Sequence, residues 1–278
     1  MFGRERIEYK TADQIRVMRR AGLVVADALA AARLAAVPGA TTADVDSAAA
    51  KVIADAGATS NFQGYGHPPF PAVTCISVND QVVHGIPGPR VIEPGDVVSI
   101  DCGAVVDGWH GDAAVTVIAG NDDDIDPADV ELSHVTEQAL WAGIAALAVG
   151  RRLGEVGAAV QDAVTAAAGD RLAIVEGYTG HGIGTAMHMA PQVLNHRTRD
   201  KGPTVRVGLC VAVEPMLTRG SPDTDVLDDQ WTVVSVDGSR AAHWEHTVAV
   251  TDDGLWVLTA PDGGVAGLAP FGVTVAPW

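Results

Sequence analysis

The sequence contains few cysteines, and no pattern that would pair them. Its three cysteines, Cys75, Cys102 and Cys210, form an odd number with no regular spacing. Domains that depend on disulfides carry even, closely spaced sets, so a disulfide framework is excluded and a reducing compartment is indicated. Residues 1–10 carry several charges and no apolar centre, so we expect no signal peptide and a cytoplasmic protein.

Basic residues and long apolar runs are also scarce. Eighteen Lys and Arg stand against 35 Asp and Glu, a formal net charge of -17. Such a surface repels phosphates, so we expect no direct nucleic-acid site and no membrane partner. The apolar stretches 21–37 and 139–150 are interrupted or too short to cross a bilayer. The acidic run 122–126 predicts a solvated linker, because the spacing and closing Glu of a calcium loop are missing.

The chain has 278 residues, of which 47% are apolar, enough for a sizeable core. Periodicity and capping signals predict helices near 11–34, 42–56, 128–149 and 153–168. Strand-like runs follow each pair of helices, at 73–78, 97–102, 113–118, 172–175, 209–214, 232–236, 246–250 and 256–259. We therefore expect a duplicated α/β (α+β) fold in one catalytic domain, 1–278. Its halves would span about 11–120 and 127–259, followed by an irregular tail at 260–278.

Two aspartates lie where a predicted hairpin would bring them together. Asp101 ends one apolar strand, and Asp112 begins the next strand after the turn signal Asp107-Gly108. Carboxylates at short range resist joint ionisation, and a divalent cation removes the conflict. Each Asp alone is also compatible with an ordinary strand-end or turn residue.

The second half supplies matching acids and one histidine. Glu214 follows a buried strand and Glu245 begins another, although either alone could be a rim residue. His181 lies between glycines that let the backbone approach a neighbour closely, although an ordinary turn histidine is the alternative. Four carboxylates and one imidazole predict an oxygen-rich site for two divalent ions.

Several segments, in order along nearly the whole chain, carry a resemblance to a known family. They are Cys75-Ile76-Ser77-Val78-Asn79, Val83-His84-Gly85-Ile86-Pro87, Asp101 and Asp112 with ten residues between them, Gly180-His181-Gly182-Ile183-Gly184, Glu214-Pro215-Met216 and Glu245-His246-Thr247. Together they resemble the type I methionine aminopeptidases of the pita-bread fold. The resemblance implies two helix–helix–strand halves, related by a pseudo-two-fold axis, around a central antiparallel sheet.

The resemblance also implies a role for each residue. Asp101 would chelate one metal ion, Asp112 and Glu245 would bridge both ions, and His181 and Glu214 would complete the second site. A hydroxide between the ions would attack the scissile carbonyl. Glu214 would carry a proton to the leaving amine. The cofactors would be two divalent ions, with cobalt, manganese, iron and zinc left open.

The resemblance extends to the substrate. His84 and His188 would hold the substrate amide and the tetrahedral intermediate. The substrates would be nascent proteins and peptides with an initiator methionine and a small second residue, processed by a monomer at the ribosome. Phe70, Cys75, Met187 and Trp231 would line the methionine pocket.

The chain departs from the family pattern next to His188. Family members usually have an aromatic residue before this histidine and an acidic one after it, where this chain has Met187 and Met189. We expect Met187 to reshape the pocket and Met189 to alter substrate reach or rate.

Two other interpretations stay open at this stage. One is a proline-specific aminopeptidase or dipeptidase of the same fold, which usually carries Glu-Pro-Gly where this chain has Glu214-Pro215-Met216. The other is a binding protein that has lost catalysis, which would be expected to lack some of the metal ligands.

Overall fold

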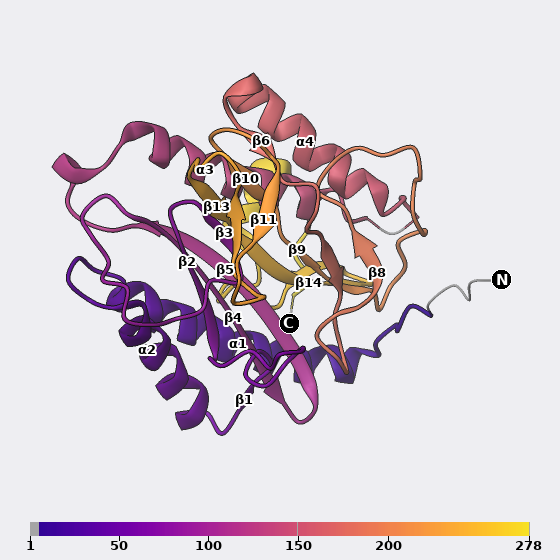
Figure 1. Cartoon of the computed structure of the whole chain (residues 1–278). Helices are drawn as coiled ribbons and strands as arrows, with labels where there is room; N and C mark the ends of the chain where they lie inside the picture. The colour runs from indigo at the N-terminus through magenta and orange to yellow at the C-terminus, as the bar shows by residue number, and fades with distance from the viewer. Residues whose placement is uncertain (1–5, 149, 278) are drawn as a thin grey trace.

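The structure, a computed structural model, describes residues 6–148 and 150–277. Residues 1–5, part of the charged start from which we predict no signal peptide, lie outside this description. Four long helices form two pairs: α1 (Ala12–Ala35) with α2 (Thr42–Asp55), and α3 (Pro127–Ala145) with α4 (Gly154–Ala168). Figure 1 shows the two pairs at opposite ends of the molecule, with the strands between them. Among the described helices, none is long and apolar enough to cross a membrane.

The helix starts follow the capping signals of the sequence. Thr11 accepts a hydrogen bond from the Gln14 backbone at 3.3 Å, and the Gln14 side chain accepts one from the Thr11 backbone at 2.8 Å. This capping box satisfies amide groups that have no partner within the helix. Asp126 caps α3 by accepting from Ala128 at 2.9 Å, and it also pairs with Arg219 at 2.8 Å. The acidic run is therefore partly a helix start as well as a joint.

A nine-stranded sheet occupies the centre, in the order β1-β4-β5-β14-β9-β7-β8, with β2 on β4 and β15 on β14. All its strand pairings are antiparallel. Its strands are β1 (Thr59–Ser60), β2 (Thr74–Val78), β4 (Val97–Val106), β5 (Trp109–Ile118), β7 (Gly180–Gly182), β8 (Met189–Val193), β9 (Cys210–Val213), β14 (Glu245–Thr251) and β15 (Gly254–Val257).

Two three-stranded sheets complete the strand layer. One has the order β13-β10-β6, and the other β11-β12-β3. Their strands are β3 (Gln81–Val83), β6 (Ala173–Ile174), β10 (Met216–Thr218), β11 (Thr224–Val226), β12 (Val233–Ser235) and β13 (Ala241–His243).

The two halves of the chain share the central sheet. Strands β4 and β5 come from the first half, and β7, β8, β9 and β14 from the second. They join where β5 pairs with β14, with Ala114 opposite Glu245 and Ala113 opposite His246. The order helix, helix, strands occurs on both sides of this junction, so the fold class predicted from the sequence is confirmed.

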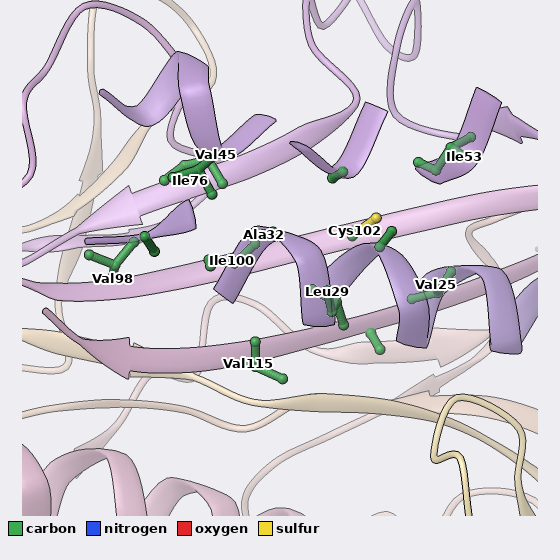
Figure 2. Close-up of a cluster of buried hydrophobic side chains, with 14 of the residues drawn as sticks. Val25, Leu29, Ala32, Val45, Ile53, Ile76, Val98, Ile100, Cys102 and Val115 are labelled. Atoms are coloured by element: carbon green, nitrogen blue, oxygen red, sulfur yellow. The ribbon is translucent and has the colours of Figure 1, made fainter. Parts of the chain in front are cut away.

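Apolar side chains on one face of β4 and β5 pack against α1. Figure 2 shows Val25 and Leu29 of α1 beside Ile100 and Cys102 of β4 and Val115 of β5. The side chains of a strand alternate between faces, so residues that flank these apolar positions, Asp101 among them, are directed away from the helices. The core therefore fixes the orientation of the acidic residues.

The tail after residue 260 is less irregular than the composition suggests. It contains the one-turn helix α5 (Val265–Leu268) and a bridge between Leu255 and Val275. Leu268 is fully buried and packs with residues of α3 and β14. The tail thus closes part of the core of the second half.

Candidate active site

Adjacent strands bring three carboxylates into one transverse row. Asp101 on β4 and Glu245 on β14 both pair with Ala114 of β5, so they flank this small side chain on one face of the sheet. Continuing the register of β14 with β9 places Glu214 opposite Glu245, where β9 ends. The motifs far apart in the sequence therefore meet because of strand pairing across the junction of the two halves.

Asp112 projects from β5 onto the same face, two residues before Ala114. Single ligand atoms of Asp112, His181 and Glu245 all lie within 4.8 Å of one another. The Asp101 Oδ1, Asp112 Oδ1 and Glu245 Oε1 atoms are buried and have no hydrogen-bond partner among the described residues. Unpartnered buried oxygens are costly, so this cluster requires protons or cations.

The electrostatics of the cluster lead to the same requirement. Burial raises the pKa of Asp101 to about 8 and raises those of Asp112, Glu214 and Glu245 well above their usual range. Repulsion between the carboxylates adds to the effect of burial for Asp112, Glu214 and Glu245. Divalent ions would replace the protons, and carboxylate oxygens with one imidazole are a donor set that suits them. The residues present fit a metal centre.

His181 lies on β7 with its ring oriented by its neighbour. Its Nδ1 donates to the Gly182 carbonyl at 3.0 Å, because a carbonyl can only accept, so Nε2 keeps its lone pair. Nε2 faces Glu214 Oε1 at 3.4 Å. Burial lowers the pKa of His181 to about 4, so the ring is neutral, as a metal ligand must be.

The glycines around His181 allow strands to approach closely. A Cβ on Gly180 would lie 2.3 Å from the Ala212 carbonyl oxygen, and one on Gly182 would lie 2.2 Å from that of Ala190. The sequence-based expectation of a close backbone approach is therefore correct, and the neighbours are β9 and the start of β8. This segment is a strand and not a turn.

The two other predicted histidines lie near the cluster. His84 has a left-handed backbone with a φ of 59°, and burial lowers its pKa to about 4. The His188 ring lies 4.4 Å from that of His181, centroid to centroid. The Tyr65 hydroxyl bonds to His188 Nδ1 at 2.7 Å. A neutral His188 that accepts the Tyr65 proton at Nδ1 carries its own proton on Nε2, available to a substrate.

One cavity of about 220 Å³ joins these groups to an apolar wall. Every residue for which we predicted a metal, catalytic or substrate-binding role lines it: Phe70, Cys75, His84, Asp101, Asp112, His181, Met187, His188, Glu214, Trp231 and Glu245. Phe70, Cys75 and Met187 belong to one buried apolar cluster, against which Trp231 packs. The Trp231 indole donates to the Pro68 carbonyl at 3.0 Å, which fixes the ring.

Four further residues line the cavity that the sequence did not identify: Phe62, Tyr65, Val83 and His243. Tyr65 and Phe62 lie among Gly and Pro residues, so no periodicity marks them. His243 lies two residues before the predicted metal ligand Glu245, and this proximity is the one feature of the sequence that could have indicated it. It comes from β13, a strand of three residues that the sequence pattern does not predict.

The two methionines beside His188 occupy different places. Met187 is 4% exposed and lines the cavity, whereas Met189 is half-buried at the start of β8 and lies outside it. Met189 lines two outer depressions with Arg6, and one of these also includes His181 and His188. Of the two, only Met187 can reshape the inner pocket.

Comparisons with known proteins agree with the geometry. The model of the family "Metallopeptidase family M24" matches residues 16–252. Methionine aminopeptidase 1 of Mycobacterium tuberculosis is 51% identical over 261 residues, covering 92% of this chain and 96% of the relative. Methionine aminopeptidase 1 of Bacillus subtilis is 40% identical over 250 residues, covering 90% of this chain and 98% of the relative.

Solved structures support the same assignment. The crystal structure of methionine aminopeptidase from Thermotoga maritima has a TM-score of 0.86 and 39% identity, covering 91% of this chain and 99% of that one. A prolidase from Pyrococcus furiosus, at 20% identity and a TM-score of 0.71, shares the fold, and this chain covers 65% of its length. The proline-specific interpretation is therefore not favoured. The chain belongs to metallopeptidase family M24 and, within it, to the type I methionine aminopeptidases.

Proposed function

We propose that this chain removes the initiator methionine from nascent proteins and peptides, and that the 220 Å³ cavity is where it does so. The observation that carries the proposal is the combination of unpartnered buried carboxylates with an apolar wall in one small cavity. An apolar pocket of aromatic and sulfur-containing side chains suits a flexible thioether. The carboxylates beside it suit divalent ions.

We assign Asp101, Asp112, His181, Glu214 and Glu245 to two divalent ions, whose identity among cobalt, manganese, iron and zinc stays open. When bound, such ions polarise a carbonyl and lower the pKa of water. In support, these residues share one face of the sheet or its edge, and His181 Nε2, which keeps its lone pair, faces Glu214.

The remaining steps fall to side chains around the cluster. Glu214 would carry the proton to the leaving amine. Its carboxylate lies inside the cavity, with Oε1 3.4 Å from His181 Nε2 and Oε2 3.7 Å from His243 Nε2. His84 and His188 are neutral donors that would bind the substrate amide and stabilise the charge that develops on its oxygen. The strained φ of His84 is consistent with such a role, since strain often accompanies functional sites.

We expect the second residue of the substrate to lie at the mouth of the cavity. Tyr65, which is 40% exposed, borders this opening together with His188. Limited room beside this pair would restrict the second residue of the substrate to small side chains. The rest of the substrate would continue along the outer depression that includes His188, Met189 and Arg6.

We further propose that the protein works as a monomer in the cytoplasm, on nascent chains at the ribosome. The three cysteines are free and buried, which is consistent with a reducing compartment. Sedimentation with and without ribosomes tests both the oligomeric state and the association.

Release of methionine from a defined peptide tests the activity. The metal-stripped protein is incubated with Met-Ala-Ser and Ala-Pro-Ala peptides, before and after addition of manganese, cobalt, iron(II) or zinc. We expect metal-dependent release from the first peptide alone, and loss of it in Asp112→Asn, which keeps the shape but not the charge. Cleavage of the proline peptide alone, or of neither, would refute the proposal.

A further inference from the structure

His243 is a buried histidine of the cavity to which no role has been given. It ends β13 and is 2% exposed. Its backbone N–H donates to Thr116 Oγ1 at 3.0 Å and to Ser99 Oγ at 3.2 Å, and its carbonyl accepts from Thr116 at 2.8 Å. These bonds anchor His243 to β4 and β5, the strands that carry Asp101 and Asp112. The position of its ring is therefore defined by the same scaffold as the acidic cluster.

The His243 ring is directed at Glu214. Its Nε2 is fully enclosed and lies 3.7 Å from Glu214 Oε2, and within residues 6–148 and 150–277 it has no hydrogen-bond partner. The other oxygen of the same carboxylate, Oε1, lies 3.4 Å from His181 Nε2. Glu214 thus lies between two imidazoles, each of which faces one of its oxygens.

We propose that His243 is a positioning residue of the metal centre, whose Nε2–H donates a hydrogen bond to Glu214 Oε2 and so directs Oε1 towards His181. This inference rests on the proposed function, in which Glu214 and His181 hold the same ion. The atoms need to approach by less than about 1 Å to reach a normal hydrogen-bond length. The bond would also satisfy a buried nitrogen that otherwise has no partner.

The alternative, that His243 is itself a metal ligand, is less consistent with the geometry. The carboxylate oxygen that His243 faces is the one turned away from His181. A hydrogen bond to that oxygen leaves the other free, which is how partners of metal ligands commonly orient them.

A positioning role predicts a specific pattern among substitutions of His243. His243→Gln keeps an N–H donor at about the reach of Nε2. His243→Leu removes the donor, and His243→Asn places an amide too short to reach Glu214. Removal of such a partner typically lowers metal affinity about 10- to 100-fold. We therefore expect this loss of affinity in His243→Leu and His243→Asn, and near-wild-type affinity in His243→Gln.

The test measures Co²⁺ and Mn²⁺ dissociation constants by calorimetry, the visible absorption spectrum of the Co²⁺ protein, and kcat and KM for Met-Ala-Ser. We expect Leu and Asn to change the Co²⁺ spectrum and to lower kcat more than they raise KM. Metal-free stability of the Leu variant should be little changed, because His243 Nε2 lies 3.7 Å from Glu214 Oε2 and makes no hydrogen bond to it in this structure. A purely structural role would instead lower metal-free stability and leave the spectrum unchanged.

Two outcomes would overturn the inference. One is an unchanged dissociation constant and spectrum in His243→Leu or His243→Asn. The other is an equal loss in His243→Gln and His243→Asn. If His243→Leu does not fold, the comparison of Gln with Asn still decides. Failure of the wild-type protein to bind either metal would refute the proposed function itself, and is therefore distinguishable.

Discussion

We expect the metal-free protein to lose stability as the pH rises from about 7.5 to about 8.5. Burial raises the pKa of Asp101 to about 8, and it raises those of Asp112, Glu214 and Glu245 in the same direction. In the unfolded chain these groups return to ordinary values of 3.8 for Asp and 4.5 for Glu. Over this window the folded state therefore binds protons that the unfolded state has released, so the free energy of unfolding falls with pH.

The lower limit of the window comes from the histidines, whose effect has the opposite sign. Burial lowers the pKa of His84 and His181 to about 4 and that of His243 to about 3, against an ordinary value of 6.5. Below about pH 6.5 the unfolded chain binds protons that these folded rings do not, so their contribution makes stability rise with pH. This opposing contribution is half present at about pH 6.5 and has largely ended by about pH 7.5, above which the carboxyls determine the slope.

The expected slope can be worked out per proton. Each carboxyl that stays protonated in the folded state alone lowers the free energy of unfolding by about 1.4 kcal/mol per pH unit. With at least one carboxyl in this state, we expect a loss of about 1.4 kcal/mol or more between about pH 7.5 and about pH 8.5. Metal ions displace these protons, so the slope should nearly vanish in the metal-loaded protein, and stabilisation by metal should grow with pH.

The free energy of unfolding at each pH can be measured by urea unfolding followed by tryptophan fluorescence, since the chain has six tryptophans. The titration is run with a chelator and with saturating manganese across the window. The side chain of Asp101→Asn cannot titrate, so the free energy of unfolding of this variant should fall less steeply with pH, by up to about 1.4 kcal/mol per pH unit. A metal-free free energy of unfolding that is flat or rises with pH, or equal slopes with and without metal, would refute the reasoning.

Three further predictions follow from contacts in the structure. Gly22→Ala should destabilise the protein by about 1–3 kcal/mol in urea unfolding, because its Cβ would lie 2.2 Å from the Leu258 carbonyl oxygen; an unchanged midpoint would contradict this packing. Met187→Ala removes a wall of the pocket, so steady-state kinetics on Met-Ala-Ser should show KM raised about tenfold and kcat changed less; a loss confined to kcat would count against its place in the pocket. Tyr65→Phe removes the bond to His188 Nδ1 and should lower kcat/KM about 2- to 10-fold, with the metal dissociation constants unchanged; altered metal binding would argue that Tyr65 acts on the metal centre.

Much of the fold could be predicted from local signals in the sequence. The capping signal at Thr11 and the helical patterns of the sequence place α1 and α2 within a few residues of their observed ends. The strands β4 and β5 extend further towards their shared turn than the sequence predicts, because Gly103 in β4 and His110-Gly111-Asp112 in β5 interrupt the apolar runs. The strand β7 was missed because Gly-His-Gly has no strand periodicity, and its pairing with β8 and β9 creates the strand.

Residues of the candidate site could be predicted where they belong to a sequence motif. Those brought to the site only by tertiary packing could not. Asp101 and Asp112 belong to one hairpin, so their proximity followed from the sequence. Tyr65 and His243 lie on a loop and a three-residue strand, and they approach the cluster only through tertiary packing. The different positions of Met187 and Met189 likewise depend on where β8 begins, which the sequence alone does not define.

The most direct test of the central claim is to measure bound metal and methionine release in the same samples. The metal-free protein is dialysed against increasing manganese, the metal per chain is counted by mass spectrometry, and release from Met-Ala-Ser is assayed. We expect activity to rise with occupancy and binding to saturate near two ions per chain, with both lost in Asp112→Asn. Activity without bound metal, or full metal binding and activity in Asp112→Asn, would contradict the assignment of this cluster as the catalytic centre.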